Sequence, residues 1–441
     1  MFAQHLKNVD VKGKKVILRF DGNVPLKTLP DGSIELRDTY RITRVAPTIE
    51  YIIMNGGIPI LFTHFSDDEG KEKPSSPGSF QTTKVLLDDL ETILGIRPIH
   101  CEECIGDPAK TFIENNAKPD QILLMENLRK DKGEKKDDPE FAKALASLGD
   151  IYCNDAFGVC HRKHASVHGI VNYFPKNCVT SGSLLRKEVN TLQYRLIDHP
   201  TYPMAVFIGG SKLSTKSKVI KKFLDRHDEK GNSPDVFLIG KLAREFARFY
   251  GMTLMGPMPN PEIIDIIKSV DIFNPKLHIA RGRIYHENHR DTVKDNDSLE
   301  ERFQMAYKAA ISPEAKITPE LVNNLAMGYQ YFKTACENLD VYDIDDDSVE
   351  SFSPYIKQAK TIMFNGPAGF FENGRNQSTV NLLRLIADNK RAYTIGGGGE
   401  TNSVIAENNL TIKYLSTGGG AFLDFVAGET LPGLEALGYY D

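Results

Sequence analysis

The feature that most constrains this chain is the alternation of short apolar runs with stretches of helical spacing. Four runs in the first half predict buried strands, and a stretch such as Phe141 to Leu148 has the helical spacing that is found between them. The four runs are Val16 to Phe20, Ile58 to Thr63, Ile122 to Met125 and Ile151 to Cys153. Strands that alternate with helices predict an α/β fold with a parallel sheet. In such sheets ligands bind beyond the carboxyl ends of the strands.

Polar and cationic residues follow each of these predicted strands. Asp21 and Asn23 follow the first, His64 the second, Arg129 the third and Arg162 the fourth. Guanidinium and imidazole groups suit a small anionic substrate, because they donate to carboxylate or phosphate oxygens. Any one of these residues could be an ordinary surface group. Their shared position after the strands predicts a binding site for a small anion.

A single long helix is predicted from Leu184 to Ile197, with His199 and Pro200 as its stop, and we expect it to connect two domains. The second half then restarts the pattern of strand, turn and helix, but its turns are rich in glycine. The five turns are Gly209 to Lys212, Gly240 to Lys241, Asn365 to Gly369, Gly396 to Gly399 and Ser416 to Gly420. This half therefore looks built to hold phosphate groups by its backbone.

The most glycine-rich turn lies within Thr394 to Ile405. Four glycines allow a sharp turn and a close approach to a ligand, and the residues from Glu400 to Ser403 are expected to cap a helix that begins at Val404. Free amides at the start of a helix favour a phosphate. Neither GxGxxG nor GxxxxGK[ST] can be placed on any of the five turns, so a nucleotide site of another kind is predicted.

Composition excludes several classes of partner. The chain has 54 basic and 59 acidic side chains and a net charge of -5, which gives no general reason to expect nucleic acid or an anionic membrane surface. The N-terminal residues lack an apolar signal core, and no apolar run approaches the roughly 18 residues of a membrane span. We therefore expect a soluble, cytoplasmic protein.

Cysteine usage points the same way, because six cysteines in 441 residues do not make a disulfide framework. Cys101 and Cys104 form a CxxC beside His100, but no second CxxC exists, so reduced thiols are expected in preference to zinc. The segment from Arg281 to Pro319 is predicted as a charged surface insertion with a helical middle. The acidic run from Asp343 to Asp347 is predicted as a solvated loop.

Taken in order, the motifs resemble those of the phosphoglycerate kinase family along nearly the whole chain. They are Arg19 to Pro25, Leu124 to Arg129, Tyr152 to Gly158 with His161 and Arg162, Gly209 to Lys212 with Lys216, Asn365 to Gly369 through Glu372, Gly397 to Gly399, and Ser416 to Gly420 with Leu431 to Gly433. Together these motifs are highly specific, whereas each alone would be weak.

The resemblance implies two doubly wound α/β domains with parallel sheets, joined by a helix and separated by a cleft. We expect an acid-substrate domain over 1–183, a connecting helix over 184–199, and a nucleotide domain over 200–426 with an insertion at about 281–319. A tail over 427–441 is expected to pack back on the first domain.

The resemblance also implies reversible phosphoryl transfer between 1,3-bisphosphoglycerate and MgADP, giving 3-phosphoglycerate and MgATP, by a monomer without nucleic-acid or membrane partners. The acid would be held by Asp21, Asn23, Arg41, His64, Arg129 and Arg162. The nucleotide would be held by Lys212, Lys216, Gly240, Asn365, Glu372, Gly397, Gly398, Gly399, Glu400 and Thr401. Arg41, Lys212 and Gly398 would act on the transferred group, and Glu400 would hold Mg²⁺.

Several positions depart from the family pattern. Asp67 stands where an arginine would grip substrate phosphate, and Thr215 and Glu400 each replace an aspartate. Lys241 follows Gly240 where the family has glycines, and Asp345 and Asp346 replace a Gly-Pro pair. Two alternatives therefore stay open from the sequence: a paralogous phosphotransferase for another small acid, and a nucleotide-binding regulatory protein without turnover. No dinucleotide fingerprint supports a dehydrogenase.

Overall fold

The computed structural model describes residues 2–65, 81–210, 213–250, 259, 261–280, 282–284, 341–344, 346–369 and 377–441. The chain divides into two compact units. Unit 1 contains residues 1–200, 397–399 and 416–441, and unit 2 contains residues 201–396 and 400–415. Each unit is described separately below.

Unit 1 is built around a parallel sheet in which seven strands lie in the order β1-β9-β8-β2-β5-β7-β6 within the described ranges. The strands are β1 (Gln4–His5), β2 (Lys15–Arg19), β5 (Ile58–Phe62), β6 (Ile99–His100), β7 (Leu123–Leu124), β8 (Ile151–Asn154) and β9 (Val179–Ser181). A separate antiparallel hairpin pairs β3 (Leu26–Thr28) with β4 (Ile34–Leu36). The four strands that the sequence predicts in this half are therefore present.

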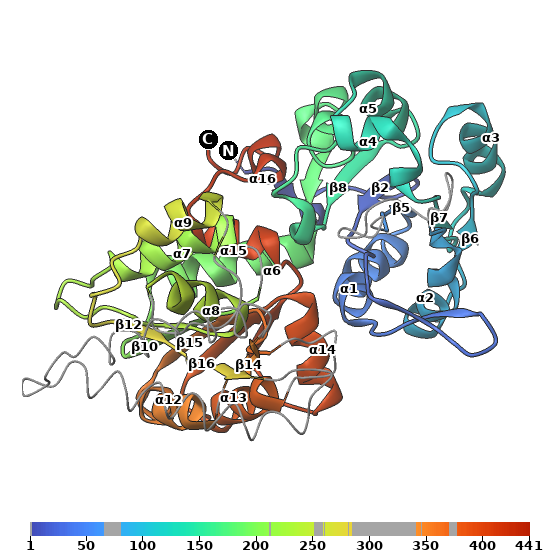
Figure 1. Ribbon diagram of the computed structural model, residues 1–441. Helices are drawn as coiled ribbons and strands as arrows, with labels where there is room; N and C mark the ends of the chain where they lie inside the picture. Colours follow the sequence, from blue (N-terminus) through green and yellow to red (C-terminus); the bar gives the residue numbers. More distant parts are fainter. Residues whose placement is uncertain are drawn as a thin grey trace, which may run out of the picture. The chain divides into compact units, whose positions relative to one another are not determined.

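Helices cover both faces of this sheet, as Figure 1 shows: α1 and α2 lie on one face, and α4 and α5 on the other. The α-helices are α1 (Tyr40–Met54), α2 (Leu87–Leu94), α3 (Gly106–Asn116), α4 (Lys132–Lys136), α5 (Pro139–Ala146), α6 (Ser183–Leu192), α15 (Gly420–Ala427) and α16 (Pro432–Ala436). Short 3-10 turns are η1 (Leu6–Asn8), η2 (Thr83–Leu86), η3 (Leu128–Lys130), η4 (Phe157–Val159), η5 (Gly169–Tyr173) and η6 (Lys176–Cys178).

The core of unit 1 follows from the spacing of apolar residues on α1. Ile42, Val45, Ile49 and Ile52 recur every three or four positions, so they share one face of the helix, and all four are buried. They belong to the same cluster as Leu61 and other residues of the central strands. Packing of α1 against the sheet in this cluster helps to hold the carboxyl ends of β2 and β5 in place.

The helix predicted from Leu184 to Ile197 differs in one respect from the prediction. The α-helix α6 ends at Leu192, and the chain continues as a π-helical segment, η7 (Gln193–Asp198). Apolar spacing identifies the buried face of a helix but does not distinguish one hydrogen-bond register from another, so this change cannot be predicted from the spacing.

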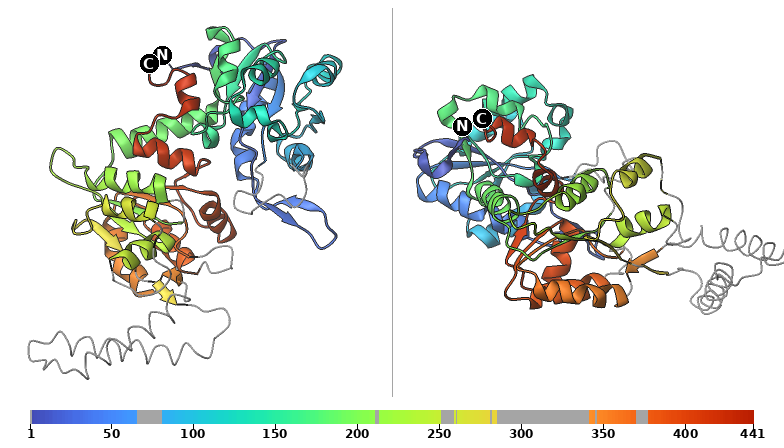
Figure 2. Two further views of the ribbon diagram at one scale, coloured as in Figure 1. Left: turned by 45° about the horizontal axis from the view of Figure 1, so that its top comes forward. Right: turned by 90° about the vertical axis from the view of Figure 1, so that its left-hand side faces the viewer.

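Both chain ends lie together in unit 1, and the two views of Figure 2 agree on this. The amide of Ala3 donates to the backbone carbonyl oxygen of Leu437 at 2.6 Å, and the ring of Phe2 meets that of Tyr439 edge to face at 5.1 Å. The final helix α16 and the residues around it therefore form part of the same unit as β1.

Unit 2 has its own sheet, with strands in the order β12-β11-β10-β15-β16-β17. The strands are β10 (Met204–Ile208), β11 (Asp235–Leu238), β12 (Leu277–Ile279), β15 (Thr361–Asn365), β16 (Tyr393–Gly397) and β17 (Tyr414–Ser416). The pairs that β10 makes with β11 and with β15 are parallel. Phe207 and Phe237 stack on these neighbouring strands with ring centroids 4.5 Å apart, which adds to the buried core.

Helices again lie on opposite faces of this sheet: α7 and α9 on one, α12 and α13 on the other (Figure 1). The helices are α7 (Leu213–Leu224), α8 (Gly240–Phe249), α9 (Pro261–Lys268), α12 (Asp346–Gln358), α13 (Gln377–Asp388) and α14 (Gly399–Glu407). An antiparallel pair joins β13 (Gly282–Ile284) to β14 (Val341–Ile344).

One local prediction for this half is wrong. The acidic run from Asp343 to Asp347 is not a loop, because Asp343 belongs to β14 while Asp346 and Asp347 begin α12. Carboxylates in the first turn of a helix interact favourably with the helix dipole. Residues 282–284 of the predicted insertion form β13, and its predicted helical middle lies outside the described residues.

Candidate functional site

The acid-binding residues predicted from the sequence come from neighbouring strands of unit 1. The strands β8, β2, β5 and β7 are adjacent and parallel, so their carboxyl ends meet along one edge of the sheet. Asp21 and Asn23 follow β2, His64 follows β5, Arg129 lies in η3 after β7, and Arg162 follows η4 after β8. The strand order explains why residues far apart in sequence share this edge.

Arg41 joins this group from a different element, the first turn of α1. Its Nη1 lies 3.3 Å from Oδ2 of Asp21 and also donates to the backbone carbonyl oxygen of Asn23. The side chain of Arg41 stays 20% exposed, whereas Asp21 is buried. Asp21 therefore orients the guanidinium while part of it still faces solvent, as a group that meets a ligand needs.

His64 is the most enclosed of the predicted acid-binding residues. It is 2% exposed, and its Nδ1 lies 3.1 Å from Nη2 of Arg19. Burial, followed by the positive charges of Arg19, Arg129 and Arg41 and by His164, holds the pKa of His64 well below its usual range. The imidazole is therefore neutral within a group of arginines, and the edge of the sheet carries a net positive charge that suits an anion.

Arg129 and Arg162 both lower the pKa of His164. Arg129 is buried, and its backbone N–H donates to Oδ1 of Asn127 at 3.0 Å. Burial is the main cause that lowers the pKa of His164 to about 3, and Arg19, Arg129 and Arg162 lower it further. The charges of all three arginines therefore act on His164.

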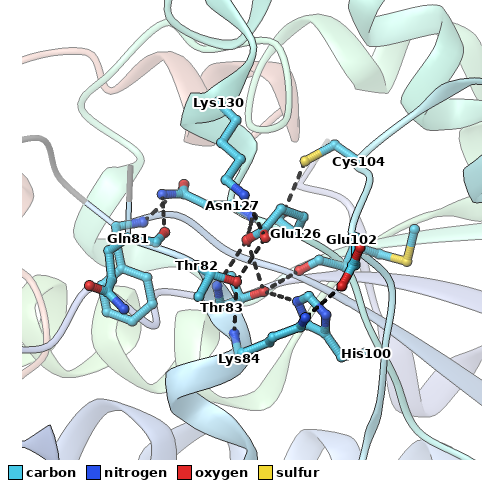
Figure 3. Close-up of polar contacts among 12 residues, drawn as sticks. Gln81, Thr82, Thr83, Lys84, His100, Glu102, Cys104, Glu126, Asn127 and Lys130 are labelled. Carbon is cyan, nitrogen blue, oxygen red and sulfur yellow. Dashed lines mark hydrogen bonds and ion pairs between the residues drawn. The ribbon is translucent and has the colours of Figure 1, made fainter. Parts of the chain in front are cut away.

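Glu126 and Asn127, shown in Figure 3, form a buried junction between the segments that follow β5 and β7. Oδ1 of Asn127 accepts from the backbone N–H groups of both Phe65 and Arg129, at 3.1 and 3.0 Å, and its Nδ2 donates to the carbonyl oxygen of Gln81 at 2.9 Å. One amide thereby fixes the residue after His64 relative to Arg129.

Glu126 holds the backbone of Asn127 in place, and its polar contacts are drawn in Figure 3. Its Oε1 accepts from the backbone N–H groups of Asn127 and Thr83, at 2.7 and 2.9 Å. Its Oε2 accepts from Thr82 Oγ1 at 2.8 Å and from Lys130 Nζ at 2.7 Å. These hydrogen bonds, that of Lys130 first, hold the pKa of Glu126 below its usual range although burial opposes them.

The CxxC of the sequence lies beside this junction but shows no metal-binding arrangement. Cys101 and Cys104 are buried, and Cys104 Sγ donates to the carbonyl oxygen of Glu126 at 2.9 Å. Burial raises the pKa of both thiols. Across the described part of the chain, no group of three or more His, Cys, Asp or Glu side chains could hold a metal ion.

Sequence reasoning missed three residues that support the acid-binding edge. Arg19 is completely buried, Ser166 accepts from its Nε at 2.8 Å, and Glu134 accepts from the hydroxyl of Ser166 at 2.7 Å. A charged residue inside an otherwise apolar predicted strand was the available signal for Arg19. Nothing in the sequence indicated its partners, which come from a later helix and loop.

The nucleotide-binding residues predicted from the sequence belong mostly to unit 2. Lys216, on α7, is buried, and its Nζ donates to the backbone carbonyl oxygen of Gly209. Gly240 opens α8 with a φ of +59°, and a Cβ there would lie 2.8 Å from the carbonyl oxygen of Pro367. Only glycine fits this approach of two turns. Lys212 and Glu372 lie outside the described residues.

Two further predicted residues carry buried polar atoms whose hydrogen bonds are not made within the described part of the chain. Asn365 ends β15, and Thr401 lies in α14. Among the described residues, neither Nδ2 of Asn365 nor Oγ1 of Thr401 has a hydrogen-bond partner. Because a buried polar atom left unpaired costs free energy, these two atoms fit a site that is completed by a polar ligand.

The glycine-rich turn is correctly placed, but the helix after it starts earlier than predicted. Gly397 ends β16, and α14 begins at Gly399, so Glu400 and Thr401 lie in its first turn instead of preceding a helix at Val404. Gly398 has a φ of +113°, which favours glycine. The first-turn amides of this helix therefore belong to Gly399 and the residues just after it.

The carboxylate of Glu400 can hold magnesium together with a nucleotide. The residue is exposed in the first turn of α14. Magnesium prefers oxygen ligands and is commonly bound by one or two carboxylates plus substrate phosphates and water. A single carboxylate beside a predicted phosphate site fits that pattern. Lys241, one of the departures from the family pattern, is exposed in the first turn of α8, whereas Asp67 and Asp345 lie outside the described residues.

Comparison with known proteins agrees with the predicted fold. The chain is similar to the crystal structure of phosphoglycerate kinase from Pyrococcus horikoshii, with a TM-score of 0.76, 25% identity and coverage of 99% of this chain and 98% of that one. The structure of phosphoglycerate kinase from Coxiella burnetii matches with a TM-score of 0.66 and 26% identity, over 99% of both chains. These matches and the parallel sheets confirm the predicted two-domain α/β fold class. No helix in the described ranges has the length and apolar character that crossing a membrane requires.

Sequence comparison leads to the same family. A family model described as phosphoglycerate kinase matches residues 6–429. Phosphoglycerate kinase of Thermosipho africanus is 34% identical over 439 residues, which cover 98% of this chain and 97% of that protein. Phosphoglycerate kinase of Acidobacterium capsulatum is 34% identical over 442 residues, covering 98% of each. The chain therefore belongs to the phosphoglycerate kinase family and is a phosphotransferase with a carboxyl group as acceptor.

Proposed function

We propose that the family's reversible transfer, between 1,3-bisphosphoglycerate and MgADP to give 3-phosphoglycerate and MgATP, runs in this chain with the acid on unit 1 and the nucleotide mostly on unit 2. The observation that carries the proposal is the positive edge of the unit 1 sheet. Arg41, Arg129 and the buried His64 follow neighbouring parts of this sheet, and burial, followed by the charges of Arg19, Arg129 and Arg41, holds the pKa of His64 well below the usual range. An acid with a carboxylate and a phosphate group is the complementary ligand.

In this proposal the acid is held by Asp21, Asn23, Arg41, His64, Arg129 and Arg162. Arg41 is the member that approaches the transferred phosphoryl group, because it is oriented by Asp21 yet stays partly exposed. The acceptor is a carboxylate that has no proton to lose, so the reaction needs no general base. Catalysis then rests on in-line positioning and on neutralising the charge of the moving oxygens.

The nucleotide is proposed to bind Lys212, Lys216, Gly240, Asn365, Glu372, Gly397, Gly398, Gly399, Glu400 and Thr401. The unpaired polar atoms of Asn365 and Thr401 support this assignment. Lys212 and the amide of Gly398 are assigned to the transferred group alongside Arg41. Magnesium, held by Glu400 and the nucleotide phosphates, would neutralise charge on the phosphate oxygens.

We further propose that the protein acts in glycolysis, in the cytoplasm and as a monomer, with domains over 1–183 and 200–426, a connecting helix over 184–199 and a tail over 427–441. Family membership supports the glycolytic role. It does not favour the two alternatives considered from the sequence, a phosphotransferase for another acid and a regulator without turnover.

The test is a coupled assay with ATP, magnesium and 3-phosphoglycerate, run on the unmodified protein, Arg41→Ala, Lys212→Ala and Lys27→Ala. We expect kcat/KM to fall by about a hundredfold or more in the first two variants, as when a single transition-state donor is removed. Lys27 is an exposed cation on β3 and is the matched control, with unchanged turnover expected.

Calorimetry with ADP separates the two halves of the proposal. Arg41→Ala should bind ADP as the unmodified protein does, because Arg41 is not among the residues assigned to the nucleotide. Full turnover in Arg41→Ala would overturn the assignment of the acid site. Absence of turnover in the unmodified protein, with ADP still bound, would favour a different acid as substrate.

A further inference from the structure

The contact between Arg19 and His64 carries information beyond the placement of the acid site. Arg19 ends β2 and is fully buried. Its three kinds of N–H group are all directed: Nε donates to Ser166 Oγ at 2.8 Å, Nη1 donates to the backbone carbonyl oxygen of Phe20, and Nη2 faces His64 Nδ1 at 3.1 Å. The guanidinium is thus fixed on three sides, and one of those sides is a ring nitrogen.

The direction of the hydrogen bond to His64 follows from the chemistry of the two groups. A guanidinium carries only donors, so the ring nitrogen that faces Arg19 has to be the acceptor. An imidazole that accepts with Nδ1 carries its single hydrogen on Nε2. A second proton, on Nδ1, would place two donors against each other.

We propose that Arg19 holds His64 in the neutral tautomer with its hydrogen on Nε2, and that Ser166 and Glu134 are positioning residues that keep Arg19 in place for this contact. The inference rests on the proposed acid site and deepens it. His64 then presents its Nε2–H as a hydrogen-bond donor to the acid. Its tautomer is set by residues that do not themselves contact the substrate.

The role of Ser166 follows from counting its hydrogen. Its hydroxyl has one, which is donated to Oε1 of Glu134 at 2.7 Å, while its backbone N–H donates to Oε2 of Glu134 at 2.9 Å. With its hydrogen used in this way, the hydroxyl oxygen faces Arg19 as an acceptor. Every step from Glu134 to His64 therefore has a defined donor and a defined acceptor.

The contacts that run from Glu134 through Ser166 and Arg19 to His64 are buried, and burial keeps the donor and the acceptor of each hydrogen bond fixed. Arg19 and Glu134 are both fully buried, with opposite charges bridged by Ser166. A buried charge without its partner is costly, so Arg19 has little freedom to swing away. Burial raises the pKa of Glu134, but the charge of Arg19 and the hydrogen bonds from Ser166 oppose that shift.

The other groups that face His64 favour the same neutral state. Besides Arg19, these are Arg129, Arg41 and His164, and each of them disfavours a second proton on the ring. With Nδ1 facing the guanidinium of Arg19, the hydrogen on Nε2 is the one that His64 can offer to an oxygen of the acid.

The first experiment is NMR of the full-length protein with ¹⁵N-labelled histidine, using His64→Gln to assign the His64 signals. We expect the pattern of the Nε2–H tautomer in the absence of any substrate, unchanged between pH 8 and pH 6. The opposite tautomer, or a doubly protonated ring within that range, would overturn the inference. This measurement depends on no supporting variant and on no catalytic activity.

The second experiment tests the positioning residues. In Ser166→Ala, Arg19 loses the acceptor of its Nε, and we expect a mixture of His64 tautomers together with a KM for 3-phosphoglycerate raised about tenfold, the effect of one lost hydrogen bond. The KM for ATP should not change. Ser166→Thr keeps the hydroxyl and should restore the single tautomer.

Ser33→Ala is the matched control, because the hydroxyl of Ser33 also donates to a carboxylate, Oδ1 of Asp31 at 2.6 Å, but on the exposed hairpin. It should leave the spectrum and both KM values unchanged. An unaltered His64 spectrum in Ser166→Ala would remove Ser166 and Glu134 from the proposal. The predicted tautomer without turnover on 3-phosphoglycerate would refute the proposed function instead, so the two failures can be told apart.

Discussion

At the scale of single residues, burial and then the nearby arginines lower the pKa of the histidines of the proposed acid site. His164 shows this most clearly, since burial and then Arg19, Arg129 and Arg162 lower its pKa to about 3. In the unfolded chain the same histidine titrates near its ordinary value of about 6.5. Below that pH the unfolded state binds more protons than the folded state, so the free energy of unfolding falls as the pH falls.

We predict that this loss amounts to about 2 kcal/mol between pH 6.5 and pH 5, at about 1.4 kcal/mol per pH unit. His164→Gln should therefore show a pH dependence that is smaller by about that amount. Urea unfolding at pH 7.5 and pH 5 measures the difference, with Lys27→Gln as a control for a change of surface charge. Equal pH dependence in His164→Gln and the unmodified protein would show that His164 titrates normally in the folded state.

The residues of this site differ in how far the sequence could predict them. Asp21, His64, Arg129 and Arg162 were found because each follows a strand, and parallel strands bring their carboxyl ends together. The partner of Arg19 could not be found, because Ser166 lies 147 positions away and no local pattern links the two. Contacts between distant side chains depend on packing that only the folded chain defines.

At the scale of elements, strands were predicted better than the starts and ends of helices. A buried strand is fully apolar, as β5 and β10 are, and so stands out from its surroundings. The start of α14 at Gly399 was missed because glycine and polar residues read as a turn, although a helix can begin within them. The π-helical end of α6 was missed for a related reason: hydrogen-bond register leaves no mark on apolar spacing.

The junction at Asn127 gives a prediction at this scale, because it ties the segment after β5 to the segment after β7. Asn127→Ala leaves the backbone N–H groups of the buried Phe65 and Arg129 without their acceptor, at about 1–3 kcal/mol each. We expect stability to fall by about 2–6 kcal/mol and the KM for 3-phosphoglycerate to rise, with the KM for ATP unchanged.

Urea unfolding and steady-state kinetics give these quantities. Asn116→Ala is the control, since the amide of Asn116 donates to the carbonyl oxygen of Phe112 on α3, away from both strands. A loss of stability in Asn127→Ala without a change in the KM for the acid would mean that the junction supports the fold but does not set the spacing of the acid-binding residues.

At the scale of the whole molecule, the main point is that unit 1 is discontinuous in sequence. Residues 416–441 return to it after the chain has formed unit 2. The amide of Gly433 donates to the carbonyl oxygen of Cys160 at 2.9 Å, which connects the tail with the segment that follows β8. Unit 1 therefore includes the last residues of the chain, whereas among residues 416–441 only Ser416, the end of β17, belongs to a strand of the unit 2 sheet.

Truncation after Gly428 tests this organisation. It removes Leu431, Leu434 and Leu437, all of which are buried. At about 1.5–3 kcal/mol for each of the three buried side chains, unit 1 should lose roughly 4.5–9 kcal/mol of stability. In differential scanning calorimetry we expect the transition of unit 1 to move to lower temperature while the transition of unit 2 stays in place. ADP identifies the latter, because a ligand raises the transition of the unit that binds it. Removal of Asp441 alone, an exposed residue, should change neither transition. If truncation lowered both transitions together, the two units would unfold as one cooperative body, and the tail would stabilise the whole molecule instead of unit 1.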